Sequence, residues 1–119
     1  MNTMYKGQKM KLVFEENCGV GCILLSGRID ASNYKEFETF YNNHFKINKR
    51  ILIDLKDVSF MDSTGLGSLV SCLKYSKEHS GILKLSGVEN KVKVVFSITK
   101  ANKIFEIFQD KESGIDSFR

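Results

Sequence analysis

An acid, two hydroxyl groups and two glycines follow one another from Asp62 to Gly67, in the order Asp-Ser-Thr-Gly-Leu-Gly. The hydroxyl of Ser63 could serve as a nucleophile, but a serine nucleophile needs a neighbouring base. The residue two positions earlier is Met61, so the Gly-x-Ser-x-Gly pattern of serine hydrolases is absent. The glycines also lack the lysine of a Walker phosphate-binding loop. We therefore expect no catalytic centre, and two roles remain for Ser63: a helix cap, or an exposed group within reach of a second protein.

The segment around Ser63 joins a strand to a helix. The run 51–55 is short and apolar, which is typical of a strand buried on both faces of a mixed sheet. Apolar residues then recur at helical spacing, at Leu66, Leu69, Val70 and Leu73. This pattern predicts a helix from 63 to about 79 with Ser63 as its N-cap. His79 would lie about 24 Å from Ser63 along that helix, and the isolated His44 is expected near the end of an earlier one.

The remaining pattern alternates short apolar runs with helical spacing. The expected elements are strands at 11–15 and 22–25, a helix from 32 or 33 to about 45, a strand at 51–55, a helix at 63–79, a strand at 82–85, a helix at 88–100, a strand at 104–108 and a helical turn within 110–119. Glu36 is expected to form a capping box with Ser32 or Asn33 at the first helix. Helices join the last three strands, which should therefore be parallel. The fold class is α/β (α+β mixed sheet), with four to five strands, about four helices and the order β-β-α-β-α-β-α-β-(α).

Length and composition predict one globular domain spanning residues 1–119. Hydrophobic residues make up 42% of the chain and charged residues 27%, which is ordinary for a soluble protein. No apolar run approaches the roughly 18 residues of a membrane span. The segment 1–11 lacks the apolar stretch of a secretion signal, so we expect a cytoplasmic protein.

Cysteines and charge exclude two further classes of site. Cys18, Cys22 and Cys72 are three in number, and neither histidine lies close to them, so we expect reduced thiols and no metal site. Cys18 and Cys22 are expected in or beside one strand, facing the same side. The net charge of +4 comes from basic residues mostly interspersed with acids, which indicates solvated faces rather than direct nucleic-acid binding.

Ten consecutive residues, Val58 to Gly67, closely resemble the signature of bacterial anti-sigma factor antagonists, whose domain is called STAS. A second stretch, from Leu25 to Asp30, resembles the Gly-x-Leu/Ile-Asp that closes the second strand of that family. The resemblance extends from about Met10 to Phe108, with the elements in the same order, and implies a STAS-like fold.

The resemblance also implies a function and a set of site residues. Ser63 falls on the position that a partner kinase phosphorylates in the family, and Asp30 on a position beside that loop that contributes to the partner surface. The partner-binding residues implied are Asp30, Asp62, Ser63, Thr64, Gly65, Leu66 and Gly67. The unphosphorylated form would bind an ATP-bound anti-sigma factor serine kinase and free the sigma factor. Phosphorylation would end binding, and a serine phosphatase would restore it, without any cofactor. The alternative is a STAS scaffold or sensor domain that controls no sigma factor.

Two features of the motif have a structural explanation as well. Glycines at 65 and 67 cost roughly 1 kcal/mol each relative to alanine in a helix. They permit close approach either of a neighbouring strand or of a partner protein. With Leu66 they are expected to form an apolar surface of low relief beside Ser63. Asp30 could equally cap the chain as it enters the first helix.

Overall fold

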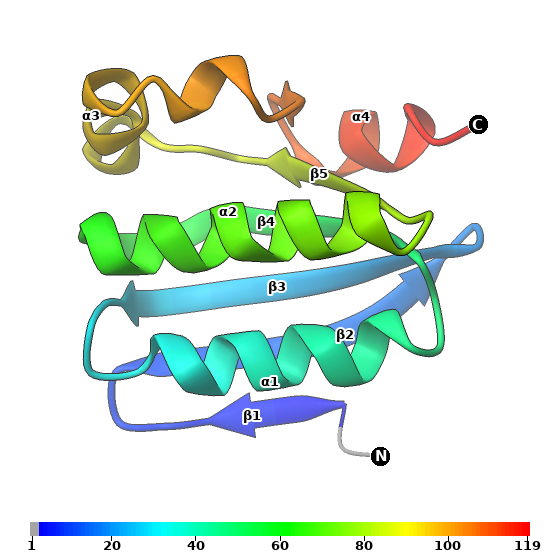
Figure 1. The fold of residues 1–119 in the computed structure, drawn as a ribbon, viewed down its shortest axis with the longest axis horizontal. Helices are drawn as coiled ribbons and strands as arrows, with labels where there is room; N and C mark the ends of the chain where they lie inside the picture. The colour runs from blue at the N-terminus through cyan, green and yellow to red at the C-terminus, as the bar shows by residue number, and fades with distance from the viewer. Residues whose placement is uncertain (1–2) are drawn as a thin grey trace.

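One six-stranded mixed sheet organises the chain. The computed structural model describes residues 3–119 (Figure 1). Its elements are β1 Met4–Lys6, β2 Met10–Asn17, β3 Val20–Ile29, α1 Tyr34–Phe45, β4 Arg50–Met61, α2 Ser63–Glu78, β5 Ile82–Ser86, α3 Asn90–Ile98, the 3₁₀ turn η1 Ala101–Lys103, β6 Ile107–Phe108 and α4 Lys111–Asp116. The strands lie in sequence order from β1 to β6. β1, β2 and β3 pair antiparallel, whereas the strands from β3 to β6 pair parallel. The parallel pairing predicted from the helical connections is confirmed.

Helices α1 and α2 lie side by side on one face of the sheet and run in the same direction (Figure 1). α1 follows β3 and α2 follows β4, and these two parallel strands end on the same side of the molecule. Both helices therefore begin beside the carboxyl-terminal ends of the strands. The central strand β4 turns Ile51, Ile53 and Leu55 into the main core, together with apolar residues of both helices. Leu52 points the other way, where it meets Cys22 of β3. The alternation of the pleat therefore buries β4 on both faces, as its continuous apolar run predicted.

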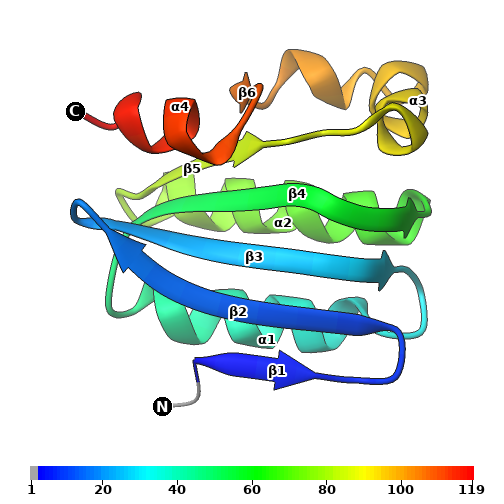
Figure 2. The same ribbon diagram turned by 180° about the vertical axis from the view of Figure 1, so that it is seen from behind.

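The opposite face is largely open, and α4 covers one corner of it (Figure 2). Ile115 of this helix and Phe118 beyond it pack on the buried cluster of Val20, Cys22 and Leu52. Asp110 caps α4 by accepting a hydrogen bond from the backbone N–H of Ser113 at 2.9 Å. Gly114 of this helix lies against Leu52, where an added Cβ would come within 2.8 Å of a leucine methyl. The helix therefore forms because it packs on the sheet.

Several boundaries differ from those predicted. The sheet has six strands rather than four or five, because Met4–Lys6 adds an edge strand beside β2. β4 continues to Met61, and the last strand shrinks to Ile107–Phe108 after a 3₁₀ turn. Cys18 lies exposed in the β2–β3 turn at φ +54°, so it does not share the buried side of Cys22. Over residues 3–119, no helix has the length and apolar character that crossing a membrane requires.

Candidate functional site

Ser63 is the first residue of α2, and Asp62 is its N-cap. A carboxylate oxygen of Asp62 accepts a hydrogen bond from the backbone N–H of Gly65 at 2.8 Å. The prediction that Ser63 itself caps the helix was wrong by one residue, because Asp62 has the extended backbone that a cap requires, at φ −95° and ψ −177°. The Ser63 side chain is exposed. In residues 3–119, its hydroxyl forms no hydrogen bond, so it is free to react or to contact a partner.

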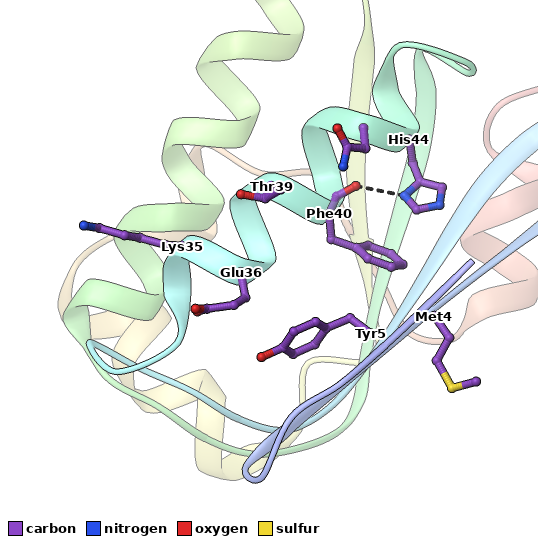
Figure 3. A pocket seen from close by; sticks show the side chains of 8 residues that line it. Met4, Tyr5, Lys35, Glu36, Thr39, Phe40 and His44 are labelled. Atoms are coloured by element: carbon purple, nitrogen blue, oxygen red, sulfur yellow. Dashed lines mark hydrogen bonds between the residues drawn. The ribbon is translucent and has the colours of Figure 1, made fainter. Parts of the chain in front are cut away.

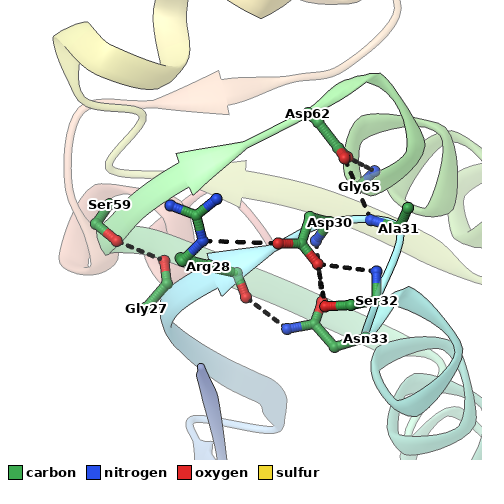
Figure 4. A network of polar contacts seen from close by, with 9 residues as sticks. All are labelled: Gly27, Arg28, Asp30, Ala31, Ser32, Asn33, Ser59, Asp62 and Gly65. Carbon is green, nitrogen blue, oxygen red and sulfur yellow. Dashed lines mark hydrogen bonds and ion pairs between the residues drawn. The ribbon is translucent and has the colours of Figure 1, made fainter. Parts of the chain in front are cut away.

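The second carboxylate oxygen of Asp62 ties this turn to the preceding loop. It accepts a hydrogen bond from the backbone N–H of Ala31, in the β3–α1 connection, at 3.2 Å (Figure 4). One side chain therefore joins the ends of two neighbouring parallel strands, β3 and β4. This connection positions Ser63, because the helix terminus that carries it is held against a loop that has its own internal bonds.

The β3–α1 loop is held mainly by Asp30. Its carboxylate accepts hydrogen bonds from the backbone N–H of Ser32 at 2.9 Å and from the Ser32 hydroxyl at 2.5 Å. These bonds hold the pKa of Asp30 below its usual value. Arg28 approaches the same carboxylate at 3.6 Å (Figure 4). The Asn33 side-chain oxygen accepts from the Asp30 backbone N–H at 2.9 Å.

This use of Asn33 explains why the predicted capping box at α1 does not form. Asn33 occupies the N-cap position, but its side chain is directed back to the loop and makes no capping bond. Asp30 is 8% exposed and stabilises the turn into α1. The structural role proposed for it from the sequence is therefore present, next to the Ser63 turn.

The two glycines of the motif differ in their surroundings. A Cβ on Gly65 would lie 2.3 Å from the carbonyl oxygen of Ile29 in β3, so glycine is required there for α2 to approach the sheet. A Cβ on Gly67 would have no neighbour within 4 Å, and this residue is exposed. Close packing on a strand explains Gly65. Among residues 3–119 no such contact exists at Gly67, which lies on the surface.

Leu66 does not form part of an exposed surface. Its side chain is 4% exposed and belongs to the main core, because its direction on α2 points it at the sheet. The expected apolar surface of Leu66 with both glycines is therefore absent. The accessible part of the motif consists of the exposed Ser63 and Gly67 and the partly exposed Asp62 and Thr64.

The sequence analysis did not identify an exposed aromatic residue near the end of β4, close to the Ser63 turn. Phe60 is 38% exposed, and the guanidinium of Arg28 lies 4.0 Å from the centre of its ring. The two residues are register partners on β4 and β3. The signal was hidden because β4 was expected to end at 55, so its last residues were not assigned to a face of the sheet.

The position of the histidines excludes a serine-base pair. His79 follows the last turn of α2 and His44 lies in the last turn of α1, whereas Ser63 begins α2. Because the two helices run in the same direction, both histidines lie at the far ends. In residues 3–119, no group of three or more potential ligands could hold a metal ion.

Comparison with known proteins places these residues in a family. The family model for the STAS domain matches residues 11–114. An anti-sigma-B factor antagonist of Bacillus subtilis is 43% identical over 63 residues, which cover 53% of this chain and 58% of that protein. A Listeria monocytogenes protein of the same name is 36% identical over 71% of this chain and 75% of its own length. The structure of the Bacillus cell fate determinant SpoIIAA in its phosphorylated form has the same fold, with a TM-score of 0.70 at 19% identity over 91% of this chain and 99% of that one.

Proposed function

Because the chain belongs to the STAS domain family, we propose that it is an anti-sigma factor antagonist that phosphorylation of Ser63 switches off. The unphosphorylated form binds an anti-sigma factor serine kinase, which then releases its sigma factor. The kinase phosphorylates Ser63 with ATP, and a serine phosphatase restores the binding form. The names of the Bacillus and Listeria relatives support the antagonist function, and SpoIIAA shows that this fold occurs in a phosphorylated form. The proposal places the chain in the cytoplasm, where ATP is available.

The observation that carries the proposal is the free hydroxyl of Ser63 on a fixed helix terminus. Asp62 takes the capping role, so the Ser63 hydroxyl is not needed for the fold. The same Asp62 side chain fixes the turn against Ala31. A kinase that presents the γ-phosphate of ATP would therefore meet an exposed acceptor whose backbone is already ordered, which reduces the entropic cost of positioning it.

The chemistry assigns this chain the role of substrate. The Ser63 oxygen attacks the γ-phosphorus, a new P–O bond forms, and the bond from that phosphorus to the bridging oxygen of ADP breaks. The proton of the hydroxyl passes to a base of the kinase, since the two histidines of this chain lie at the far ends of α1 and α2. The chain therefore needs no catalytic residue of its own.

Phosphorylation should change binding and leave the fold unchanged. The phosphate adds about −1.5 to −2 charges at pH 7. At the N-terminus of α2 the helix dipole favours this charge by about 0.3–1 kcal/mol, and the Asp62 carboxylate opposes it by a similar amount after solvent screening. These contributions roughly cancel. Loss of binding then arises at the interface, where the phosphate would have to shed water and would clash with a surface that fits a hydroxyl.

The test uses the intact chain with its kinase and Mg-ATP. Ser63→Ala should bind the kinase and incorporate no phosphate, and Ser63→Asp should bind weakly. Thr64→Ala is the matched control, because it removes the neighbouring hydroxyl and should leave labelling at Ser63 intact. Mass spectrometry measures incorporation and calorimetry measures binding. Labelling of Ser63→Ala, or equal affinity of the phosphorylated and unmodified chains, would refute the switch. Binding to a signalling complex that contains no sigma-factor regulator would favour the scaffold alternative.

A further inference from the structure

Helix α3 carries apolar residues on two opposite faces. Val92 and Phe96 are buried in the main core. Val94 and Ile98 are 57% and 76% exposed, and at 3.6 residues per turn they lie on the side of the helix opposite Val92 and Phe96. The helix itself lies at one corner of the molecule in both views (Figures 1 and 2). A helix that is apolar on all sides is ordinarily buried, so the outward face of α3 is suited to contact with a further surface.

The surroundings of this outward face are basic. Residues 90–104 contain four lysines and no aspartate or glutamate. All four are exposed: Lys91, Lys93, Lys100 and Lys103. Lys91 lies three positions before Val94 and seven before Ile98, so it projects from the same face of α3 as these two residues.

A third exposed apolar residue lies beside α3. Ile104 directly follows the 3₁₀ turn η1 and is 49% exposed. Its neighbour Phe105 packs on Phe96 of α3, with ring centroids 6.1 Å apart, which brings this segment against the helix. We refer to the three exposed aliphatic residues and the four lysines together as the α3 surface.

We propose that the α3 surface binds the anionic lipid surface of a membrane. Val94, Ile98 and Ile104 enter the boundary between headgroups and acyl chains, and the lysines lie against the lipid phosphates. Peripheral binding of this kind strengthens with the apolar area buried and with the electrostatic attraction to anionic lipids. Each lysine near such a surface increases the binding constant about fivefold. The cytoplasmic leaflet carries a negative surface potential, so it has the charge that the α3 surface requires.

The residue types of the α3 surface favour lipid over protein. The buried centres of protein interfaces are enriched in aromatic residues and arginine and depleted of lysine, and valine is under-represented among the residues that dominate binding. The α3 surface consists of valine, isoleucine and lysine. A second copy of the chain is disfavoured, because the lysines of two such surfaces would face one another and repel.

The hollow between β1 and α1 supplies matched controls (Figure 3). Met4 borders it and is 51% exposed, close to the value for Val94. Lys35 borders it too and is exposed, like Lys91. Lys35 and Lys91 are each the second residue of a helix, so reversal of either charge meets a similar helix dipole. β1 forms one edge of the sheet, whereas α3 connects β5 and β6 at the other edge.

Cosedimentation of the intact chain with lipid vesicles tests the proposal. At low salt we expect binding to vesicles of equal parts phosphatidylglycerol and phosphatidylcholine, and at least about tenfold weaker binding to phosphatidylcholine alone. Ile98→Ser should weaken binding to the mixed vesicles about tenfold, whereas Met4→Ser should not. Lys91→Glu should weaken it about tenfold more than Lys35→Glu, although both change the net charge equally. All four side chains are exposed, so the variants should fold, which circular dichroism checks.

Equal binding to the two kinds of vesicle would overturn the proposal, as would binding to neither or equal effects of the two charge reversals. If the chain binds no vesicles and Ile98→Ser weakens kinase binding, the α3 surface contacts a protein and the proposal is wrong. The vesicle measurements are made without the kinase, so their result does not depend on the function proposed for Ser63.

Discussion

Replacement of Gly65 by alanine should displace the start of α2 from the sheet. The new Cβ would lie 2.3 Å from the carbonyl oxygen of Ile29 and 2.9 Å from its carbonyl carbon. Ordinary contact begins near 3.4 Å, so the first turn of α2 must move by about 1 Å. The neighbour is backbone in β3 and cannot rotate away. The displaced turn carries Ser63 and the capping bond of Asp62.

The expected change in the free energy of unfolding follows from three contributions, two that destabilise the fold and one that stabilises it. Overpacking of this kind costs about 1–3 kcal/mol, and weakening of the Asp62 cap adds about 1 kcal/mol. The higher helix propensity of alanine returns about 1 kcal/mol. Gly65→Ala should therefore lose about 1–3 kcal/mol, or about 4–12 °C in Tm for a domain of this size.

Gly67→Ala is the matched control, because the same substitution two residues later meets no atom within 4 Å. It should gain up to about 1 kcal/mol. The loss of freedom in the unfolded chain is the same for both variants and cancels in their difference, which should be about 2–4 kcal/mol. Urea unfolding monitored by circular dichroism measures both values. Stabilities of Gly65→Ala and Gly67→Ala within about 0.5 kcal/mol of each other would refute the packing argument.

Three further predictions concern residues of the Ser63 turn and of the neighbouring β3–α1 loop. Gly67→Phe should weaken kinase binding in calorimetry while unfolding changes by less than about 1 kcal/mol; unchanged affinity would locate the docking surface elsewhere. Asp62→Ala should lose about 1–2 kcal/mol of stability and Asp62→Asn much less, because asparagine can still cap Gly65; equal losses in urea titrations would contradict the capping role. The pKa of Asp30 is held below 3.8 by the Ser32 bonds, so its carboxylate stabilises the fold above that pH and the contribution is lost as the pH falls through the folded pKa. The free energy of unfolding of Asp30→Asn should therefore fall less steeply than that of the unmodified chain as the pH is lowered. The same pH dependence for both proteins in acid would contradict this contribution of Asp30.

The local pattern of apolar residues was sufficient to predict the order of the main helices and strands. The apolar run 51–55 and the helical spacing after Ser63 predicted a strand followed by a helix, because periodicity depends only on neighbouring residues. The helices expected between the last three strands predicted that those strands are parallel. The ten residues from Val58 to Gly67 indicated the family, which the match over residues 11–114 confirms. Phosphorylation of Ser63 and its partners remain predictions.

The tertiary structure determined which residue of the motif does what. Asp62 caps α2 through its extended backbone and its bond from Gly65, and its second oxygen accepts a bond from Ala31, 31 residues earlier in the chain, a contact that no local pattern contains. Gly65 and Gly67 are equivalent by spacing, yet only Gly65 lies against the Ile29 carbonyl. Leu66 faces the core because the packing of α2 on the sheet decides which side of the helix is buried. The edge strand Met4–Lys6 exists through its pairing with β2. Periodicity identifies helices and strands because it is local, whereas burial and hydrogen-bond partners depend on contacts that form only when distant segments meet.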